Sequence, residues 1–261
     1  MRRAALLLLL AAAPAAPSWA GEPTVLALRE NGGLAFIDCA FDGFAQDCLW
    51  DSGSARTNAP NVPPLSGYPL AGVDGKRDLV KFASLRFGAA ELGPAAVWRG
   101  GMGFPSLGAD LSTNRRFQVT PTPSPSLILE PAATVEAPAQ VLYRDGQNRI
   151  VVEIGLGSRR VRAMWDTGTA NTRVARSALR LAPEDFAKTG EYSSRKESGS
   201  RYRLATLSVG AARLKDVEVL DSDFDRGKVV VILGWDVIRR LDWRFDPERR
   251  QWSAREPSPA D

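Results

Sequence analysis

The stretch Leu-Trp-Asp-Ser-Gly-Ser-Ala-Arg-Thr, residues Leu49–Thr57, returns later in the chain as Met-Trp-Asp-Thr-Gly-Thr-Ala-Asn-Thr, residues Met164–Thr172. One small acidic turn therefore occurs twice. A single Asp-Ser-Gly triplet means little, because Asp, Ser and Gly are all common in ordinary tight turns. Whether the repetition is accidental depends on the sequence around the two copies.

The flanking sequence is duplicated as well. Shifting the chain against itself by 115 residues aligns the two turns without a gap, and later blocks align at offsets of 122 and 126. Offsets that grow by so little mean that the second copy has only short loop insertions. The chain therefore contains two similar halves, in which three pairs of blocks recur in one order: Val25–Thr57 with Gln140–Thr172, Phe82–Leu92 with Leu204–Leu214, and Leu107–Leu111 with Leu233–Val237.

Each half has the sequence pattern of β structure. Apolar and polar residues alternate in segments such as Leu34–Phe41, Arg149–Leu156 and Tyr202–Val209, and clusters of Gly, Asp and Ser separate them. The apolar run Lys228–Leu233 fits a strand that is buried on both faces. Asp236–Leu241 then predicts one or two helical turns.

Prolines divide the chain between the two halves. They recur from Pro121 to Pro138, and proline has no N–H to donate to a sheet, so we expect an extended linker outside any central sheet. The expected organisation is a leader at residues 1–20, an N-terminal lobe at 21–120, the linker at 121–138, a C-terminal lobe at 139–255 and a flexible tail at 256–261.

The first twenty residues have the features of an export signal. Arg2-Arg3 precedes the apolar run Ala4–Ala13, and Ser18-Trp19-Ala20 forms a small-x-small cleavage site. The alternative, a membrane anchor, needs about twenty apolar residues, and this run is far shorter. We therefore expect a mature chain that begins at Gly21 and is exported, periplasmic or secreted in a bacterial envelope, with no stable membrane anchor.

Composition limits the chemistry of the chain. Its 261 residues include 34 Lys and Arg, 30 Asp and Glu, two cysteines and no histidine. Without histidine, Ser-His-Asp and Cys-His nucleophile systems lack an essential part, as does every His- or Cys-rich zinc site. Loss of the leader lowers the basic excess from four to two, which is too small to indicate nucleic acid binding. Hydrolysis must rely on carboxylates, hydroxyls or Lys and Arg, and no metal or other cofactor is indicated.

The two cysteines predict a disulfide. An exported chain folds in an oxidising compartment, where thiols pair. Cys39 and Cys48 flank Phe41–Phe44, a turn-like sequence between two alternating segments, so a bridge across the arms of a hairpin is expected to have a structural role. Two unpaired thiols in the core are the alternative.

The repeated turns resemble those of aspartic proteases of the retropepsin and pepsin type. The resemblance rests on apolar-apolar-Asp-Ser/Thr-Gly-Ser/Thr at Leu49–Ser54 and Met164–Thr169, and on the apolar-Leu-Gly-x-Asp-apolar element best seen at Ile232–Val237. It implies the all-β acid-protease fold: two similar closed β-barrel lobes related by pseudo-twofold symmetry, with the active-site cleft between them. It also implies a monomer that acts as a pseudo-dimer on a peptide or protein substrate.

By this resemblance, Asp51 and Asp166 are the catalytic pair. Two carboxylates held a few ångströms apart share one proton, so one can act as base toward a bound water while the other acts as acid. The supporting loop residues are glycines that admit backbone close to the carboxylates, hydroxyls that bond across the lobe interface, and hydroxyls that bond the carboxylates: Gly53 and Gly168, Ser52 and Thr167, and Ser54 and Thr169.

Three features depart from the family pattern. A tryptophan precedes each Asp, at Trp50 and Trp165, which we interpret as core packing rather than substrate stacking. Ser106 replaces the apolar residue of the first supporting element. The flaps that would close over substrate fall at Gly72–Asp78 and Arg195–Tyr202, and the first is short, charged and without tyrosine.

Two functional hypotheses remain. The first is an exported aspartic endopeptidase that activates water with Asp51 and Asp166, and the two intact turns favour it. The second is a weak or inactive module of the same fold that binds peptides or an envelope partner in the cleft, and the weak flaps favour it. Pairing of each lobe with its counterpart in another chain is unnecessary, because one chain carries both half-sites.

Overall fold

A computed structural model of the chain describes residues 23–59, 68–70, 78–99, 105–121, 124–132, 134–194, 197–224 and 227–258. The leader at residues 1–20, the expected start at Gly21, most of the first flap segment Gly72–Asp78 and the last three residues of the tail lie outside these ranges. Within the described ranges, no helix is long and apolar enough to cross a membrane.

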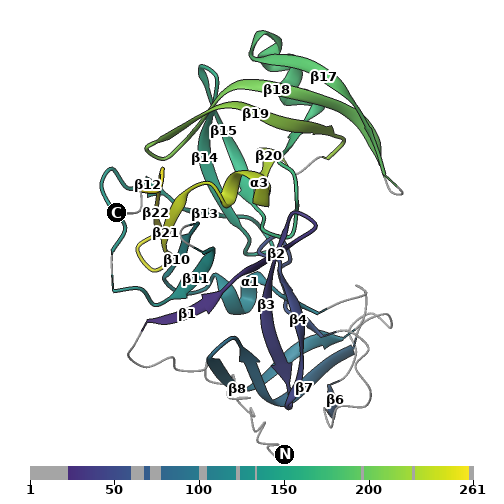
Figure 1. Cartoon of the computed structure of the whole chain (residues 1–261), viewed down its shortest axis with the longest axis vertical. Coiled ribbons are helices and arrows are strands. Elements are labelled where there is room, and N and C mark those ends of the chain that lie inside the picture. The colour runs from purple at the N-terminus through teal and green to yellow at the C-terminus, as the bar shows by residue number, and fades with distance from the viewer. Residues whose placement is uncertain are drawn as a thin grey trace, which may run out of the picture.

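The N-terminal lobe is a β-sheet that closes on itself (Figure 1). Six neighbouring strands form the ring β3-β4-β9-β5-β8-β7, because β7 pairs with β3 as well as with β8. Strands β2 and β6 extend the sheet on either side of the closure. In chain order the strands are β2 (Arg29–Asn31), β3 (Leu34–Phe41), β4 (Phe44–Trp50), β5 (Asn58–Ala59), β6 (Tyr68–Leu70), β7 (Asp78–Phe87), β8 (Ala90–Arg99) and β9 (Ser106–Leu107).

The C-terminal lobe repeats this topology. Its ring is β14-β15-β20-β16-β19-β18, which the pairing of β14 with β18 closes. The prediction of an all-β chain with two closed barrels is thus confirmed. In chain order the strands are β13 (Tyr143–Arg144), β14 (Ile150–Leu156), β15 (Arg159–Trp165), β16 (Arg173–Ala175), β17 (Phe186–Ser193), β18 (Ser198–Val209), β19 (Ala212–Ser222) and β20 (Val229–Leu233).

Helices are short in both lobes. They are α1 (Ala109–Ser112), α2 (Arg176–Leu181), α3 (Trp235–Ile238) and a 3₁₀ turn at Pro183–Asp185. Helix α3 confirms a helical turn in the predicted segment Asp236–Leu241, although it begins one residue earlier and ends at Ile238. Helices α1 and α3 hold equivalent places in the two halves, each directly after the Leu-Gly pair of the supporting element.

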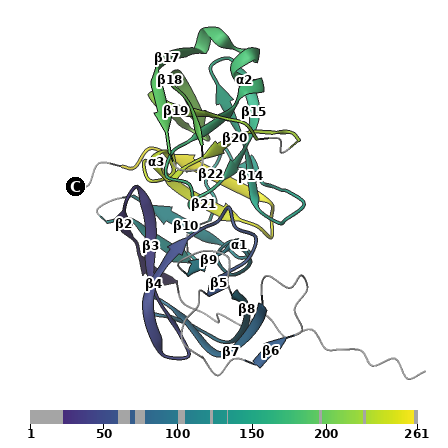
Figure 2. The ribbon, with the colours of Figure 1, turned by 90° about the vertical axis from the view of Figure 1, so that its right-hand side faces the viewer.

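A third sheet joins the lobes (Figure 2). Its strand order is β1-β11-β10-β21-β22-β12. The neighbours β10 and β21 come from different halves of the chain and pair antiparallel through Phe117 and Phe245. The strands are β1 (Thr24–Ala27), β10 (Phe117–Thr120), β11 (Ser126–Leu129), β12 (Gln140–Val141), β21 (Asp242–Asp246) and β22 (Gln251–Arg255).

One expectation about the linker is wrong. Residues 121–138 do not lie wholly outside a central sheet, because β11 pairs with β1 on one side and with β10 on the other. The reason is local: Ser126–Leu129 falls between Pro125 and Pro131, so every residue of the strand keeps its N–H. The domain boundaries that we placed around this segment remain a prediction.

Aromatic side chains fill the core where the lobes meet. Trp50 and Trp165 are fully buried and their rings lie edge to face, 5.5 Å apart between centroids. Trp165 also packs against Trp243 and Phe245 from β21. Such rings each remove a large apolar area from water. The interpretation of Trp50 and Trp165 as core residues is therefore confirmed, and one apolar core continues through both lobes.

Two groups of polar contacts between the lobes lie beside the short helices α1 and α3. In the first, the Glu30 carboxylate of the N-terminal lobe accepts hydrogen bonds from Trp235 Nε1 at 3.0 Å and from Arg239 at 2.8 Å. In the second, Arg144 of the C-terminal lobe donates to the carbonyl and hydroxyl oxygens of Thr113. Each group joins the first strand of one lobe's sheet, β2 or β13, to the short helix of the other lobe or to the residue that ends it.

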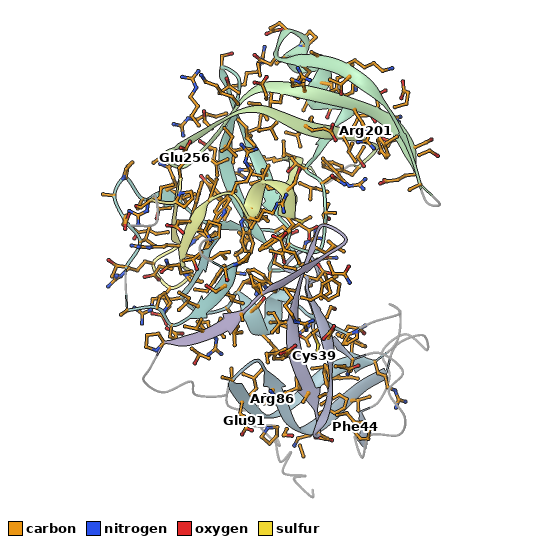
Figure 3. The ribbon with its side chains drawn as sticks, viewed as in Figure 1. Cys39, Phe44, Arg86, Glu91, Arg201 and Glu256 are labelled. Atoms are coloured by element: carbon orange, nitrogen blue, oxygen red, sulfur yellow. A yellow bond between two sulfur atoms is a disulfide. The ribbon has the colours of Figure 1, made fainter. Side chains whose placement is uncertain are left out.

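The predicted disulfide joins Cys39 and Cys48, whose Cα atoms are 5.8 Å apart. Both cysteines are buried in the β3–β4 hairpin of the N-terminal lobe (Figure 3). Reduction is expected to lower the free energy of unfolding by about 2–3 kcal/mol, because the bridge closes a short loop in the unfolded chain. The peptide hydrolysis that the sequence resemblance implies should persist while the chain stays folded. Denaturant unfolding with and without reductant checks the first result, and loss of hydrolysis in a reduced but folded chain would contradict the second.

Candidate active site

Each acidic turn begins where a strand of its barrel ends. Asp51 follows β4 and Asp166 follows β15, and each of these strands runs parallel to the strand of a supporting element, β9 or β20. The N–H of Asp51 donates to Leu107 O and that of Asp166 to Leu233 O, both at 3.0 Å. Both aspartates are therefore anchored by backbone in the same way.

A threonine ties each turn to its supporting element. Thr57 Oγ1 accepts from Gly108 N at 3.0 Å and donates to Asp110 Oδ1 at 2.8 Å. In the other lobe Thr172 makes the same two contacts, to Gly234 N at 3.1 Å and to Asp236 Oδ1 at 2.8 Å. The sequence pattern predicted no separate role for these threonines or for the two helix aspartates, although each recurs at the equivalent place in both copies. Burial raises the pKa of both helix aspartates.

The residues after the two aspartates bond reciprocally across the lobe interface. Ser52 N donates to Thr167 Oγ1 and Thr167 N donates to Ser52 Oγ, both at 3.0 Å. The two hydroxyls also reach the partner strand, from Ser52 to Trp165 O at 3.0 Å and from Thr167 to Trp50 O at 2.7 Å. Both side chains are completely buried. These four bonds fix the two turns relative to each other, because a buried polar group that lost its partner would carry a desolvation penalty.

The glycines of the turns allow each carboxylate to approach the turn of the other lobe. A Cβ atom on Gly53 would lie 2.2 Å from the Asp166 carboxylate, and one on Gly168 would lie 2.3 Å from Asp51 Oδ1. Each turn therefore presses its backbone against the aspartate of the other lobe. Asp51 and Asp166 are both mostly buried, each about 8% exposed, so their charges are poorly screened by water.

Hydrogen bonds to the carboxylates come mostly from the turns themselves. Asp51 Oδ1 accepts from Ser54 N at 2.9 Å, and Asp166 Oδ1 accepts from Gly168 N at 3.0 Å. The Thr169 hydroxyl donates to Asp166 Oδ2 at 3.0 Å. The matching expectation for the Ser54 hydroxyl is wrong: it donates to Arg56 O at 2.9 Å. The Ser54 hydroxyl thus bonds to a backbone carbonyl of its own turn, and Ser54 contacts the Asp51 carboxylate through its N–H.

The electrostatics of the pair favour a shared proton. Burial, and then the neighbouring charge of Asp166, raise the pKa of Asp51 to about 7. The backbone N–H groups of Ser54 and Gly53 oppose this rise, as does the positive charge of Arg149. One carboxyl group of the pair thus keeps its proton at pH values where an ordinary carboxyl group is ionised. The pair can therefore contain one acid and one base at the same time.

Stability should therefore depend on pH in an unusual direction. An aspartate whose folded pKa lies above its unfolded value binds more protons in the folded state. Its contribution to the free energy of unfolding is therefore present below about pH 4 and is lost as pH rises through about 7. We expect the free energy of unfolding to fall between these limits by an amount on the order of a few kcal/mol. Denaturant titrations at several pH values check this. A flat profile, or the same slope in an Asp51→Asn variant, would contradict it.

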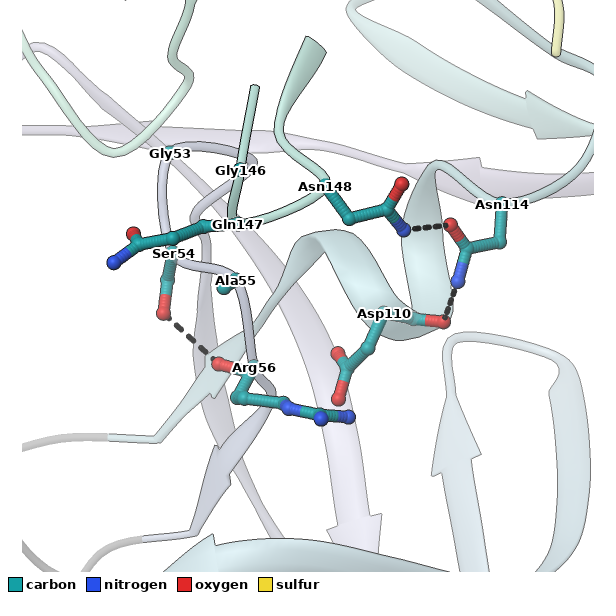
Figure 4. A pocket seen from close by; sticks show the side chains of 9 residues that line it. All are labelled: Gly53, Ser54, Ala55, Arg56, Asp110, Asn114, Gly146, Gln147 and Asn148. Atoms are coloured by element: carbon teal, nitrogen blue, oxygen red, sulfur yellow. Dashed lines mark hydrogen bonds between the residues drawn. The ribbon is translucent and has the colours of Figure 1, made fainter. Parts of the chain in front are cut away.

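A cavity of about 590 Å³ opens beside the Asp51 turn (Figure 4). Gly53–Arg56 of the N-terminal lobe form one side, and Gly146–Asn148 of the C-terminal lobe form another. Asp110 and Asn114 complete the lining. Two of the supporting residues, Gly53 and Ser54, thus contact the two aspartates and also line this cavity.

Ser106, the departure in the first supporting element, is fully buried in β9. Its hydroxyl has no hydrogen-bond partner within the part of the chain that the structure describes. Its strand still pairs with β4 and β5. The serine therefore occupies the apolar position without altering the support of the Asp51 turn.

Comparison with known proteins agrees with this geometry. The family model described as aspartyl protease matches residues 150–237, which carry the second acidic turn and its supporting element. The crystal structure of an aspartic proteinase from Irpex lacteus superimposes with a TM-score of 0.63, at 12% identity, over 91% of this chain and 98% of that one. No curated protein sequence matches the chain.

The fold and the paired turns define a two-lobed protein of the acid-protease architecture. The family match in the second lobe and the fold of the whole chain support an aspartic protease of the pepsin and retropepsin type, a peptidase hydrolase.

Proposed function

We propose that the chain is an exported aspartic endopeptidase, in which Asp51 and Asp166 together activate the water that attacks a peptide bond. The observation that carries the proposal is the approach of each aspartate to the glycine of the opposite turn. Each buried carboxylate lies against the turn that carries the other, as two carboxylates that share one water and one proton would require.

The reaction follows from the protonation of the pair. The ionised carboxylate removes a proton from the water between the two aspartates, and the water oxygen bonds to the carbonyl carbon of the substrate. The protonated carboxyl donates its proton to the carbonyl oxygen, which leaves a tetrahedral intermediate. In the breakdown the C–N bond breaks: one hydroxyl of the intermediate returns its proton to the ionised carboxylate and becomes the carbonyl of the acid product, and the nitrogen leaves as an amine with the proton that the other carboxyl took from the water.

The residues beside the two aspartates position the carboxylates for this chemistry. The reciprocal bonds of Ser52 and Thr167 keep the turns in register, so the two carboxylates do not have to reorganise during the reaction. The Thr169 hydroxyl and the Ser54 and Gly168 N–H groups favour charge on the carboxylates and orient them. One chain supplies both halves, so a monomer is sufficient as a pseudo-dimer.

Export is part of the proposal. It rests on the leader-like composition of residues 1–20 and on the Cys39–Cys48 disulfide, since such bridges are typical of oxidising compartments. We propose a periplasmic or secreted protein of a bacterial envelope. N-terminal sequencing of the cell-envelope form tests this, with Gly21 as the expected first residue.

Incubation of the mature chain with a mixed peptide library from pH 3 to 8, with and without a statine-type transition-state analogue, tests the activity. We expect cleavage that the analogue suppresses. A folded chain that binds the library but cuts nothing at any pH would replace the enzyme with a peptide-binding module of the same fold.

A further inference from the structure

The cavity beside the Asp51 turn adjoins the proposed catalytic pair. Gly53, whose backbone lies against Asp166, also lines the cavity, and Ser54, Ala55 and Arg56 follow it along the same wall. A peptide that passes the two aspartates would therefore place one of its side chains there. The described residues of the lining offer amide groups, a hydroxyl and two charged groups, and Ala55 is the only aliphatic side chain among them.

The acidic group of this cavity already has a structural role. Asp110 Oδ1 accepts hydrogen bonds from both the N–H and the hydroxyl of Thr57, each at 2.8 Å. The equivalent aspartate of the other lobe, Asp236, accepts from Thr172 in the same manner. Since both copies use this residue to hold the turn, a role in substrate selection is not needed to explain Asp110.

The basic group has no such explanation. Arg56 is exposed and forms no ion pair among the described residues, although its charge lies near enough to Asp110 to oppose the rise in the pKa of that carboxyl group. Its counterpart in the second copy of the turn is Asn171, so the duplicated architecture does not require a cation at this place. Figure 4 shows the Arg56 side chain among the cavity residues, beside the helix that carries Asp110.

We propose that Arg56 is a specificity-determining residue that selects a substrate carrying an acidic side chain on the Asp51 side of the cleft. Guanidinium groups bind carboxylates through two parallel hydrogen bonds, which gives both affinity and orientation. Because Asn171 occupies the equivalent position in the other lobe, the preference applies to one side of the scissile bond only. This inference rests on the proposed peptidase function.

A positional peptide series tests the proposal. Each flanking position of one cleaved peptide carries Glu, Gln or Lys in turn, and kcat/KM is measured for the wild type and for Arg56→Glu. We expect Glu to exceed Lys by about tenfold at one position, as for a partly exposed ion pair, and the order to invert in Arg56→Glu. Raising the ionic strength should reduce the preference. Arg213→Glu, which changes an exposed arginine on β19 outside the cavity, should leave the wild-type order intact.

The outcomes separate this inference from the function on which it rests. Cleavage at equal rates with Glu, Gln and Lys at every position overturns the role of Arg56 and leaves the peptidase intact. If the wild type cleaves nothing, statine-type peptides with the same three side chains are compared by calorimetry. Tighter binding of the Glu analogue, lost in Arg56→Glu, then supports the anionic subsite although turnover has failed. Equal binding of all three overturns it.

Discussion

Asp51→Asn and Asp166→Asn are each expected to lower kcat/KM for peptide hydrolysis by at least about a thousandfold. An amide can neither take the proton of the attacking water nor donate one to the carbonyl oxygen. The two losses should be similar, and the double variant should be little worse than either single variant, because groups that act as one unit are not additive. Steady-state kinetics on a peptide found in the library screen measure the effect.

Matched variants separate chemistry from folding. Asn is nearly isosteric with Asp, and circular dichroism should show both variants folded. Asp216→Asn, on an exposed part of β19, should retain wild-type rates. A folded Asp166→Asn variant that still cleaved peptides at more than about a tenth of the wild-type rate would contradict the shared pair, since one carboxylate would then suffice. Peptide affinity that survives both substitutions in a chain without turnover would favour the binding module.

The duplicated blocks of sequence predicted the main architecture because a barrel and its turn recur as one unit. The offset of 115 residues that aligns the acidic turns also aligns β3 with β14 and β4 with β15. Strand alternation then identified β structure in both halves. These features are local in sequence, so they could be predicted without knowing which strands pair.

The remaining features depend on partners that are distant in sequence. Strand β11 is four residues long and lies among prolines, so only its pairing with β1 and β10 reveals it as part of a sheet. The sequence does not show which acceptor the Ser54 hydroxyl uses, and in the folded turn that acceptor is Arg56 O. Thr57 and Thr172 could have been found, because each precedes a strand at the same place in both copies and each is paired with an aspartate of the supporting element.

Gly53→Ala and Gly168→Ala are expected to lower kcat/KM by at least about a hundredfold, because a displacement near 1 Å at a reacting group can cost that much. The added Cβ would lie 2.2 Å from the Asp166 carboxylate in the first variant and 2.3 Å from Asp51 Oδ1 in the second. Neither contact is possible, so a carboxylate must turn away or the lobes must move apart.

Stability distinguishes these two responses. If the lobes separate, the buried bonds between Ser52 and Thr167 lengthen, and Tm should fall together with activity. If only the carboxylate turns, activity falls with little change in Tm. Gly190→Ala is the matched control: nothing lies within 4 Å of its Cβ position in β17, so both activity and Tm should stay close to those of the wild type. Wild-type kcat/KM and Tm in both Gly53→Ala and Gly168→Ala would show that the turns do not hold the two carboxylates together, and the proposed catalytic pair would fail with that result.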